Sequence, residues 1–198
     1  MTVLDVPALS QKESDVTALY DRKGCGLTSL MMVMQYYEVK PKVLELAEVA
    51  DDLKAFSHES GWVHDGLINI ARNYNLKGFR INYTQLEDED VTKAEEIFSE
   101  SGSSDEEIDK FKESVAFAKE NSPVQDLERL IDASTPVIVS MDKAYAKTLF
   151  SHLIVLRGFE NNQVIVNDPW NNGPDHKISK EDFEKYWTKR AIFIFKES

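Results

Sequence analysis

The chain has 198 residues, a formal net charge of −12 and one cysteine. This length suits a single domain that can bury a core without disulfides or metals. The single cysteine excludes an internal disulfide and a zinc cluster built from several thiolates of this chain. The acidic balance opposes non-specific binding to nucleic acid or to anionic membranes, and mildly favours neutral or cationic substrates.

The N-terminus shows no basic region followed by an apolar core, so no secretory signal is predicted. No apolar run approaches the length of a membrane span, and we therefore expect no membrane insertion. These observations favour a cytoplasmic protein, or an exported one whose leader has been removed.

The first half of the chain predicts mainly helices. Its apolar runs are bounded by glycine and proline, which commonly mark the ends of regular elements. The expected elements are an extended segment at 3–9, a buried helix from Thr28 to about Glu38, a helix over 40–56, a helix from Val63 to Tyr74 and a strand from Gly78 to Tyr83.

Residues 86–122 differ from the rest in composition, because they are strongly acidic and contain a Gly-Ser break. The apolar positions between the charges predict one or two amphipathic helices. The pattern is typical of a solvated surface insertion. A lid over a substrate groove is the alternative interpretation.

The last third predicts β-structure, because three β-branched apolar runs follow one another. The expected elements are a helix at Asp126–Ala133, strands at 136–141, 152–159 and 163–168, a helix at 177–187 with Ser179 as its N-cap, and a strand at 191–195. Helices first and strands later indicate the α+β class, with N-terminal helices packed on a C-terminal antiparallel sheet. We expect one domain over 1–198, with a helical insertion at 86–122.

Cys25 lies in Gly-Cys-Gly directly before the apolar helix. Unpaired N–H groups and the helix dipole at such a position stabilise a thiolate and lower its pKa. The flanking glycines would allow a sharp turn and the close approach of a substrate carbonyl. A lone cysteine is also commonly a buried structural residue, so Cys25 needs partners before it indicates catalysis.

His152 begins one apolar strand and Asp168 ends the next. A short Glu-Asn-Asn connection predicts an antiparallel hairpin, which brings both residues to the same end. A two-residue loop at Asn161-Asn162 would turn Asp168 to the opposite face from His152. A three-residue loop starting at Glu160 would place it opposite Ile154, diagonal to His152 and within reach. We therefore predict the three-residue loop.

A histidine beside Cys25 could take its proton, and a carboxylate could orient that histidine. Gln11 could donate an N–H to a developing oxyanion beside the backbone N–H of Cys25. His64 is expected to pair with Asp65 at a helix start. No phosphate-binding loop, dinucleotide fingerprint or clustered His/Cys ligands occur, so no cofactor or metal is expected.

Several motifs together resemble a known family. They are Val-Pro-x-x-Ser-Gln, Gly-Cys-Gly-x-Thr-Ser-Leu, His-x-Ile-Val-x-x-Gly-Phe, and Val-Asn-Asp-Pro-Trp before a Ser-x-x-Asp-Phe helix. This order is similar to the bacterial peptidase 39-like proteins, relatives of the bacteriocin-leader-processing peptidases with a papain-like fold. The resemblance covers 3–84 and 124–195. It implies Cys25 as nucleophile, His152 as base and Asp168 as its partner, acting on a peptide or protein substrate.

The sequence thus predicts a cysteine peptidase or amidase that hydrolyses a peptide or isopeptide bond through a thioester. Two alternatives remain open. The same three residues could transfer the acyl group to an amine, since amines also release thioesters. The fold could also serve as a catalytically inactive peptide-binding module.

Overall fold

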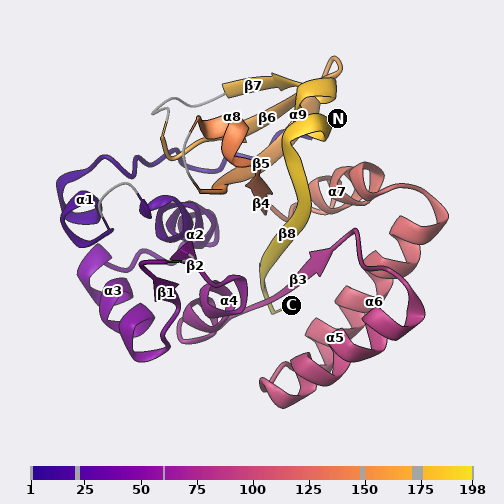
Figure 1. The fold of residues 1–198 in the computed structure, drawn as a ribbon, viewed down its shortest axis with the longest axis horizontal. Coiled ribbons are helices and arrows are strands. Elements are labelled where there is room, and N and C mark those ends of the chain that lie inside the picture. The colour runs from indigo at the N-terminus through magenta and orange to yellow at the C-terminus, as the bar shows by residue number, and fades with distance from the viewer. Residues whose placement is uncertain (1, 21–22, 60, 148–149, 171–175, 198) are drawn as a thin grey trace.

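The computed structural model describes residues 2–20, 23–59, 61–147, 150–170 and 176–197 (Figure 1). Its main sheet is antiparallel, with six strands in the order β3-β8-β4-β5-β6-β7. These strands are β3 (Leu76–Asn82), β8 (Trp187–Lys196), β4 (Val137–Met141), β5 (His152–Glu160), β6 (Gln163–Asn167) and β7 (His176–Ser179). A small hairpin, β1 (Phe56–Ser57) with β2 (Gly61–Trp62), lies outside this sheet.

Helices cover both sides of the sheet (Figure 1). The N-terminal ones are α1 (Ser14–Tyr20), α2 (Cys25–Tyr36), α3 (Val43–Asp52) and α4 (His64–Arg72). The later ones are α5 (Asp88–Glu100), α6 (Asp105–Glu120), α7 (Pro123–Asp132), α8 (Lys143–Ala146) and α9 (Lys180–Tyr186). In this view α1 to α4 lie on one side, and α5 to α7 lie on the other. The predicted α+β class is confirmed.

α2 is the central helix of the N-terminal side and packs on β5. Every residue from Cys25 to Met34 is buried, which explains why its sequence is apolar nearly all round. α4 packs on β3 with one apolar face, as expected for an amphipathic helix at the surface of a sheet.

Several predicted boundaries were wrong. α2 begins at Cys25 instead of Thr28, and the helix expected over 40–56 covers only Val43–Asp52 because Phe56 pairs with Trp62 in the small hairpin. α1, α8 and this hairpin were not predicted, since short elements carry little periodicity. Ser179 is the N-cap of α9 as predicted, and its hydroxyl accepts the Asp182 N–H at 3.0 Å.

The acidic stretch 86–122 forms α5 and α6. Its 13 acidic and 4 basic residues carry nine of the twelve net negative charges of the chain. α6 packs on β3, and both helices lie across the sheet from α2, which begins with Cys25 (Figure 1). The lid interpretation is therefore wrong, because these helices do not cover the start of α2.

A buried carboxylate, Glu107, anchors α6 to the sheet. It is 3% exposed and accepts hydrogen bonds from the Gly78 N–H at 2.7 Å, the Ser104 N–H at 2.7 Å and the Arg72 Nε at 3.0 Å. A carboxylate out of water requires such partners, since desolvation disfavours its charge. Glu107 thus joins a helix start, a strand and α4.

We predict that Glu107→Ala lowers the free energy of unfolding by about 3–5 kcal/mol, because it leaves Arg72 and two backbone donors without their acceptor. Denaturant unfolding followed by circular dichroism measures this loss. Glu106→Ala is the matched control, because Glu106 is partly exposed and forms ion pairs with Lys77 and Lys110. This substitution should change the free energy of unfolding by less than about 1 kcal/mol. Equal losses in the two variants would contradict the anchoring role of Glu107.

Candidate active site

The β5–β6 hairpin differs from the prediction at its turn. Glu160 pairs with Gln163, so the loop has two residues, and both have positive φ (48° at Asn161 and 61° at Asn162). Two-residue hairpin turns of type I′ have this geometry, and asparagine tolerates it. The predicted three-residue loop is therefore wrong.

A β-bulge nevertheless restores the register that the site needs. The ladder shifts between Leu156 and Gly158, where Arg157 is the extra residue on β5. Beyond this bulge Val155 pairs with Asn167, and continuing the ladder places Asp168 opposite Ile154. His152 is then diagonal to Asp168 on the same face, within reach of a polar side chain.

The N-terminal segment packs against this bulge. The Leu4 N–H donates to the Arg157 carbonyl at 2.7 Å, and the Arg157 Nη1 donates back to the Leu4 carbonyl at 2.9 Å. Val3 forms an antiparallel bridge with Gly158, and a Cβ on Gly158 would meet the Val3 Cα at 3.0 Å. These contacts explain both the glycine and the position of the bulge.

Cys25 is the first residue of α2 and is 8% exposed. Gly24 has an ordinary helical φ of −71°, so the two flanking glycines do not serve a sharp turn. They serve close packing, because a Cβ on Gly24 would lie 2.3 Å from the Val16 Cγ1, and one on Gly26 would lie 2.3 Å from the Trp62 ring. The backbone before and after the thiol is thereby held against α1 and β2.

The structure brings Cys25, His152 and Asp168 together. The His152 Nε2 lies 2.7 Å from the Asp168 Oδ1, and the His152 side chain also hydrogen-bonds with the Cys25 thiol. All three side chains are buried. The carboxylate fixes the ring orientation and leaves Nδ1 for the sulfur.

Cys25, His152 and Asp168 shift one another's pKa values towards the charged forms. Burial alone would raise the pKa of the Cys25 thiol, but the hydrogen bond and charge of His152 and the backbone N–H groups of Leu153 and Gly26 lower it overall. Burial opposes protonation of His152, yet Asp168 and Cys25 raise its pKa to about 9. The pKa of Asp168 is lowered, since His152 and the Trp170 N–H outweigh its burial. The directions of these three pKa shifts favour a thiolate–imidazolium pair beside a carboxylate.

Two further groups orient Asp168. The Trp170 N–H donates to its Oδ1 at 2.8 Å, and the Tyr145 hydroxyl donates to its Oδ2 at 3.4 Å. Tyr145 belongs to the short helix α8, whose side chains the sequence analysis did not connect with the site. No local pattern marks it, because only the tertiary fold brings α8 to the end of β6.

Gln11 lies next to these residues. It is 2% exposed, its N–H donates to the Pro169 carbonyl at 3.0 Å, and its Cβ is 3.3 Å from where a Cβ on Gly24 would stand. It is thus packed between the residue after Asp168 and the residue before Cys25. This position differs from that of a solvated loop glutamine.

The other predicted histidine pairing was wrong. Asp65 bonds with Arg80 at 2.6 Å instead of with its neighbour His64. Burial, together with the charges of Arg80 and Arg190, lowers the pKa of His64 to about 4. His64 is therefore neutral at the start of α4, and His152 is the histidine that contacts Cys25.

Within the described residues, no group of three or more His, Cys, Asp or Glu side chains is arranged to hold a metal ion. In the same part of the chain no helix combines the length and apolar character that crossing a bilayer requires.

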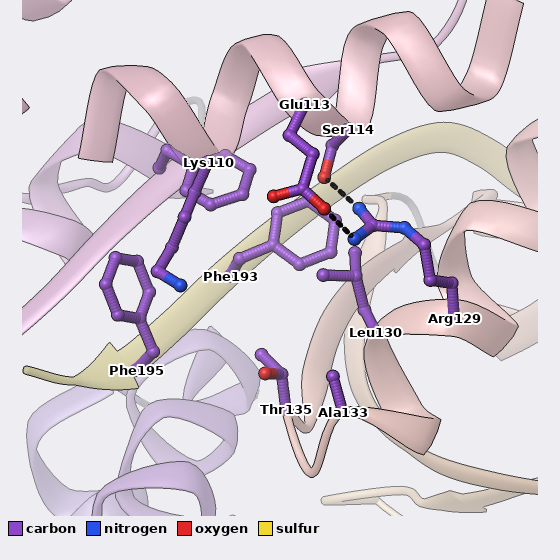
Figure 2. A pocket seen from close by; sticks show the side chains of 10 residues that line it. Lys110, Glu113, Ser114, Arg129, Leu130, Ala133, Thr135, Phe193 and Phe195 are labelled. Atoms are coloured by element: carbon purple, nitrogen blue, oxygen red, sulfur yellow. Dashed lines mark hydrogen bonds and ion pairs between the residues drawn. The ribbon is translucent and has the colours of Figure 1, made fainter. Parts of the chain in front are cut away.

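A cavity of about 190 Å³ lies elsewhere, between α6, α7 and β8 (Figure 2). The rings of Phe193 and Phe195 line it, and Arg129 at its edge is bonded to Glu113 and Ser114. None of the residues predicted for the site contributes to its lining. The cavity therefore has no part in the chemistry at Cys25.

Several solved structures share the fold. The peptidase domain of Streptococcus ComA, a bi-functional ABC transporter involved in a quorum sensing pathway, is 19% identical, with a TM-score of 0.60 over 97% of this chain and 99% of that one. A double glycine motif protease from an AMS/PCAT transporter, in complex with the leader peptide, is 21% identical, with a TM-score of 0.56 over 99% and 95%. A C39-like peptidase of Bacillus anthracis is 17% identical, with a TM-score of 0.62 over 100% and 98%.

Comparison with curated proteins gives no match. The peptidase C39-like family, in contrast, matches residues 3–191, nearly the whole length. The fold and this match agree with the resemblance seen in the sequence motifs. The chain belongs to the peptidase C39-like family and has the papain-like α+β fold of its cysteine peptidases.

Proposed function

We propose that this protein is a cysteine peptidase that hydrolyses a peptide or isopeptide bond with Cys25 as nucleophile, His152 as acid and base, and Asp168 as the residue that orients His152. The observation that carries the proposal is the buried chain of contacts from the Cys25 thiol through the His152 ring to the Asp168 carboxylate. A lowered thiol pKa beside a histidine of raised pKa is the arrangement that nucleophilic catalysis by cysteine needs.

The reaction follows from this geometry. The Cys25 thiolate adds to the scissile carbonyl carbon, and the oxygen becomes an oxyanion. We assign the stabilisation of this oxyanion to the backbone N–H of Cys25 and the side-chain amide of Gln11, because Gln11 is buried against Gly24, the residue before Cys25. His152 gives its proton to the leaving amine, which leaves a thioester on Cys25. Water then loses a proton to His152, attacks the thioester and releases the acid and the thiol.

A peptide substrate is favoured by the chemistry and by the relatives. The similar double glycine motif protease from an AMS/PCAT transporter is seen in complex with the leader peptide, which supports a peptide as the occupant of the site.

Thiol reactivity tests the nucleophile without knowledge of the substrate. We predict that Cys25 reacts with iodoacetamide at pH 6 much faster than a free thiol, because its pKa is lowered. His152→Ala should slow this reaction about tenfold or more, since each unit of pKa above the buffer pH removes about nine-tenths of the thiolate. His58→Ala is the control, because His58 is exposed and lies outside the site. If Cys25 of the unsubstituted protein is alkylated at the rate of a free thiol, the proposed enzymatic function is contradicted.

The pH dependence of peptide cleavage tests the acid and the orienting residue. With a peptide library as substrate, kcat/KM should rise as the thiolate forms and fall above about pH 9, where His152 loses its proton. Asp168→Asn removes the interaction that raises the pKa of His152, so the alkaline limb should move to lower pH and kcat should fall by about 10²-fold or more.

Asp52→Asn, which changes an exposed acid at the end of α3, should leave this profile unchanged. Adding a primary amine distinguishes hydrolysis from acyl transfer, because an acyltransferase would convert most of the thioester into amide product. Rapid alkylation together with no cleavage of any peptide would favour a peptide-binding module.

A further inference from the structure

The first residues of β5 lack a partner on the side where β6 would continue. Within the described residues, the β5–β6 ladder ends at Val155 and Asn167, whereas β4 still pairs with Leu153 and His152. Backbone N–H and C=O groups that are buried require partners, because an unpaired polar group is costly away from water.

The helix α2 supplies these partners to Leu153, the residue that directly follows His152. The backbone N–H of Leu153 lies close enough to Cys25 to lower the pKa of its thiol. The Leu153 carbonyl accepts a hydrogen bond from the Ser29 hydroxyl at 3.1 Å, and Ser29 is completely buried. Cys25 and Ser29 are four residues apart and therefore lie on the same face of the helix.

We infer that Ser29 is a positioning residue of this site: its bond to the Leu153 carbonyl fixes the start of β5 on α2, so that the His152 ring and the Leu153 N–H both face the Cys25 sulfur. The inference rests on the proposed function, because it assigns Ser29 a role in presenting the nucleophile. Ser29 acts on the sulfur and the imidazole indirectly, through its hydrogen bond to the Leu153 carbonyl.

The position of the Ser29–Leu153 hydrogen bond explains how its loss would affect the groups around the Cys25 sulfur. A hydrogen bond weakens steeply as its angle closes. The Leu153 N–H and C=O lie on either side of one Cα, so a shift of the carbonyl also displaces the N–H. Without the hydroxyl, the buried carbonyl loses its donor, and the start of β5 is free to tilt away from α2. The Leu153 N–H and the imidazole then both lose their alignment with the sulfur.

The charged groups around Cys25 stay the same when the Ser29 hydroxyl is removed. They are His152 on β5, Asp168 at the end of β6, and His176 on β7 together with Tyr145 on α8, which act on Asp168. A changed titration of Cys25 in a Ser29 variant therefore reports the position of β5 and not a lost charge.

The neighbouring residue provides a matched control. Thr28 is 1% exposed, and its hydroxyl has no hydrogen-bond partner in the described part of the chain. Thr28→Val thus deletes a buried hydroxyl from the same turn of the same helix without breaking a bond. Ser29→Ala keeps α2 intact, because alanine is the best helix former.

The experiment is the rate of Cys25 alkylation by iodoacetamide between pH 4 and 10 in the unsubstituted protein, Ser29→Ala and Thr28→Val, with thermal unfolding as a check on folding. Cys25 is the only thiol, so the rate reports one group. We expect Ser29→Ala to raise the apparent pKa of the Cys25 thiol and to lower the alkylation rate at pH 6 by about three- to tenfold. A tenfold lower rate corresponds to a rise of about one pKa unit. Thr28→Val should stay within about twofold of the unsubstituted protein.

Two outcomes would overturn the role assigned to Ser29 and leave the proposed function standing. One is an unshifted profile in Ser29→Ala while the unsubstituted protein reacts rapidly at pH 6. The other is an equal shift in Thr28→Val, which would make the effect one of general packing. An ordinary thiol pKa in the unsubstituted protein is a different result, because it would overturn the proposed function and, with it, the role of Ser29.

Discussion

The contact between Asp168 and His152 depends on one extra residue in β5. A regular ladder from the two-residue turn would point the carboxylate to the opposite face of the sheet, since side chains alternate along a strand. The bulge at Arg157 shifts the register by one and returns Asp168 to the face of His152. The N-terminal segment bonds to Arg157 on both its carbonyl and its guanidinium. The first few residues of the chain thus stabilise a register that is used at the other end of the strand.

The three ionisable groups of the site are stable in the interior only as a set. A buried thiolate, imidazolium or carboxylate alone would shift its pKa towards the neutral form. Together, each neighbour offsets the desolvation of the next, and backbone N–H groups of Leu153, Gly26 and Trp170 complete the hydrogen bonding. The chemistry therefore depends on main-chain geometry at two strand ends and one helix start as much as on the three side chains.

Much of this site could be predicted from the sequence, because its parts are local. Gly-Cys-Gly before an apolar helix and two β-branched strands with an Asn-Asn turn are patterns of short range. The position of the extra residue could not be predicted, since it depends on residues 3–6 packing against residues 157–158. The reason for the glycines could not be predicted either, because the residues packed against them, Val16 and Trp62, belong to α1 and β2. Tyr145 has no local signal, and Ser29 stands in the Gly-Cys-Gly-x-Thr-Ser-Leu motif without one that indicates its role. The partners of both residues belong to other elements.

The charge of this protein is unevenly distributed, and that changes what its net value means. Nine of the twelve net negative charges lie in 86–122, on helices across the sheet from the start of α2 (Figure 1). In solvent at physiological ionic strength, electrostatic potentials decay over about 8 Å, and these helices lie on the other side of the sheet from the start of α2 (Figure 1). A diffusing substrate therefore meets a local potential at Cys25 that the isoelectric point does not describe. Ionic strength should govern encounters with α5 and α6 more than encounters with the thiol.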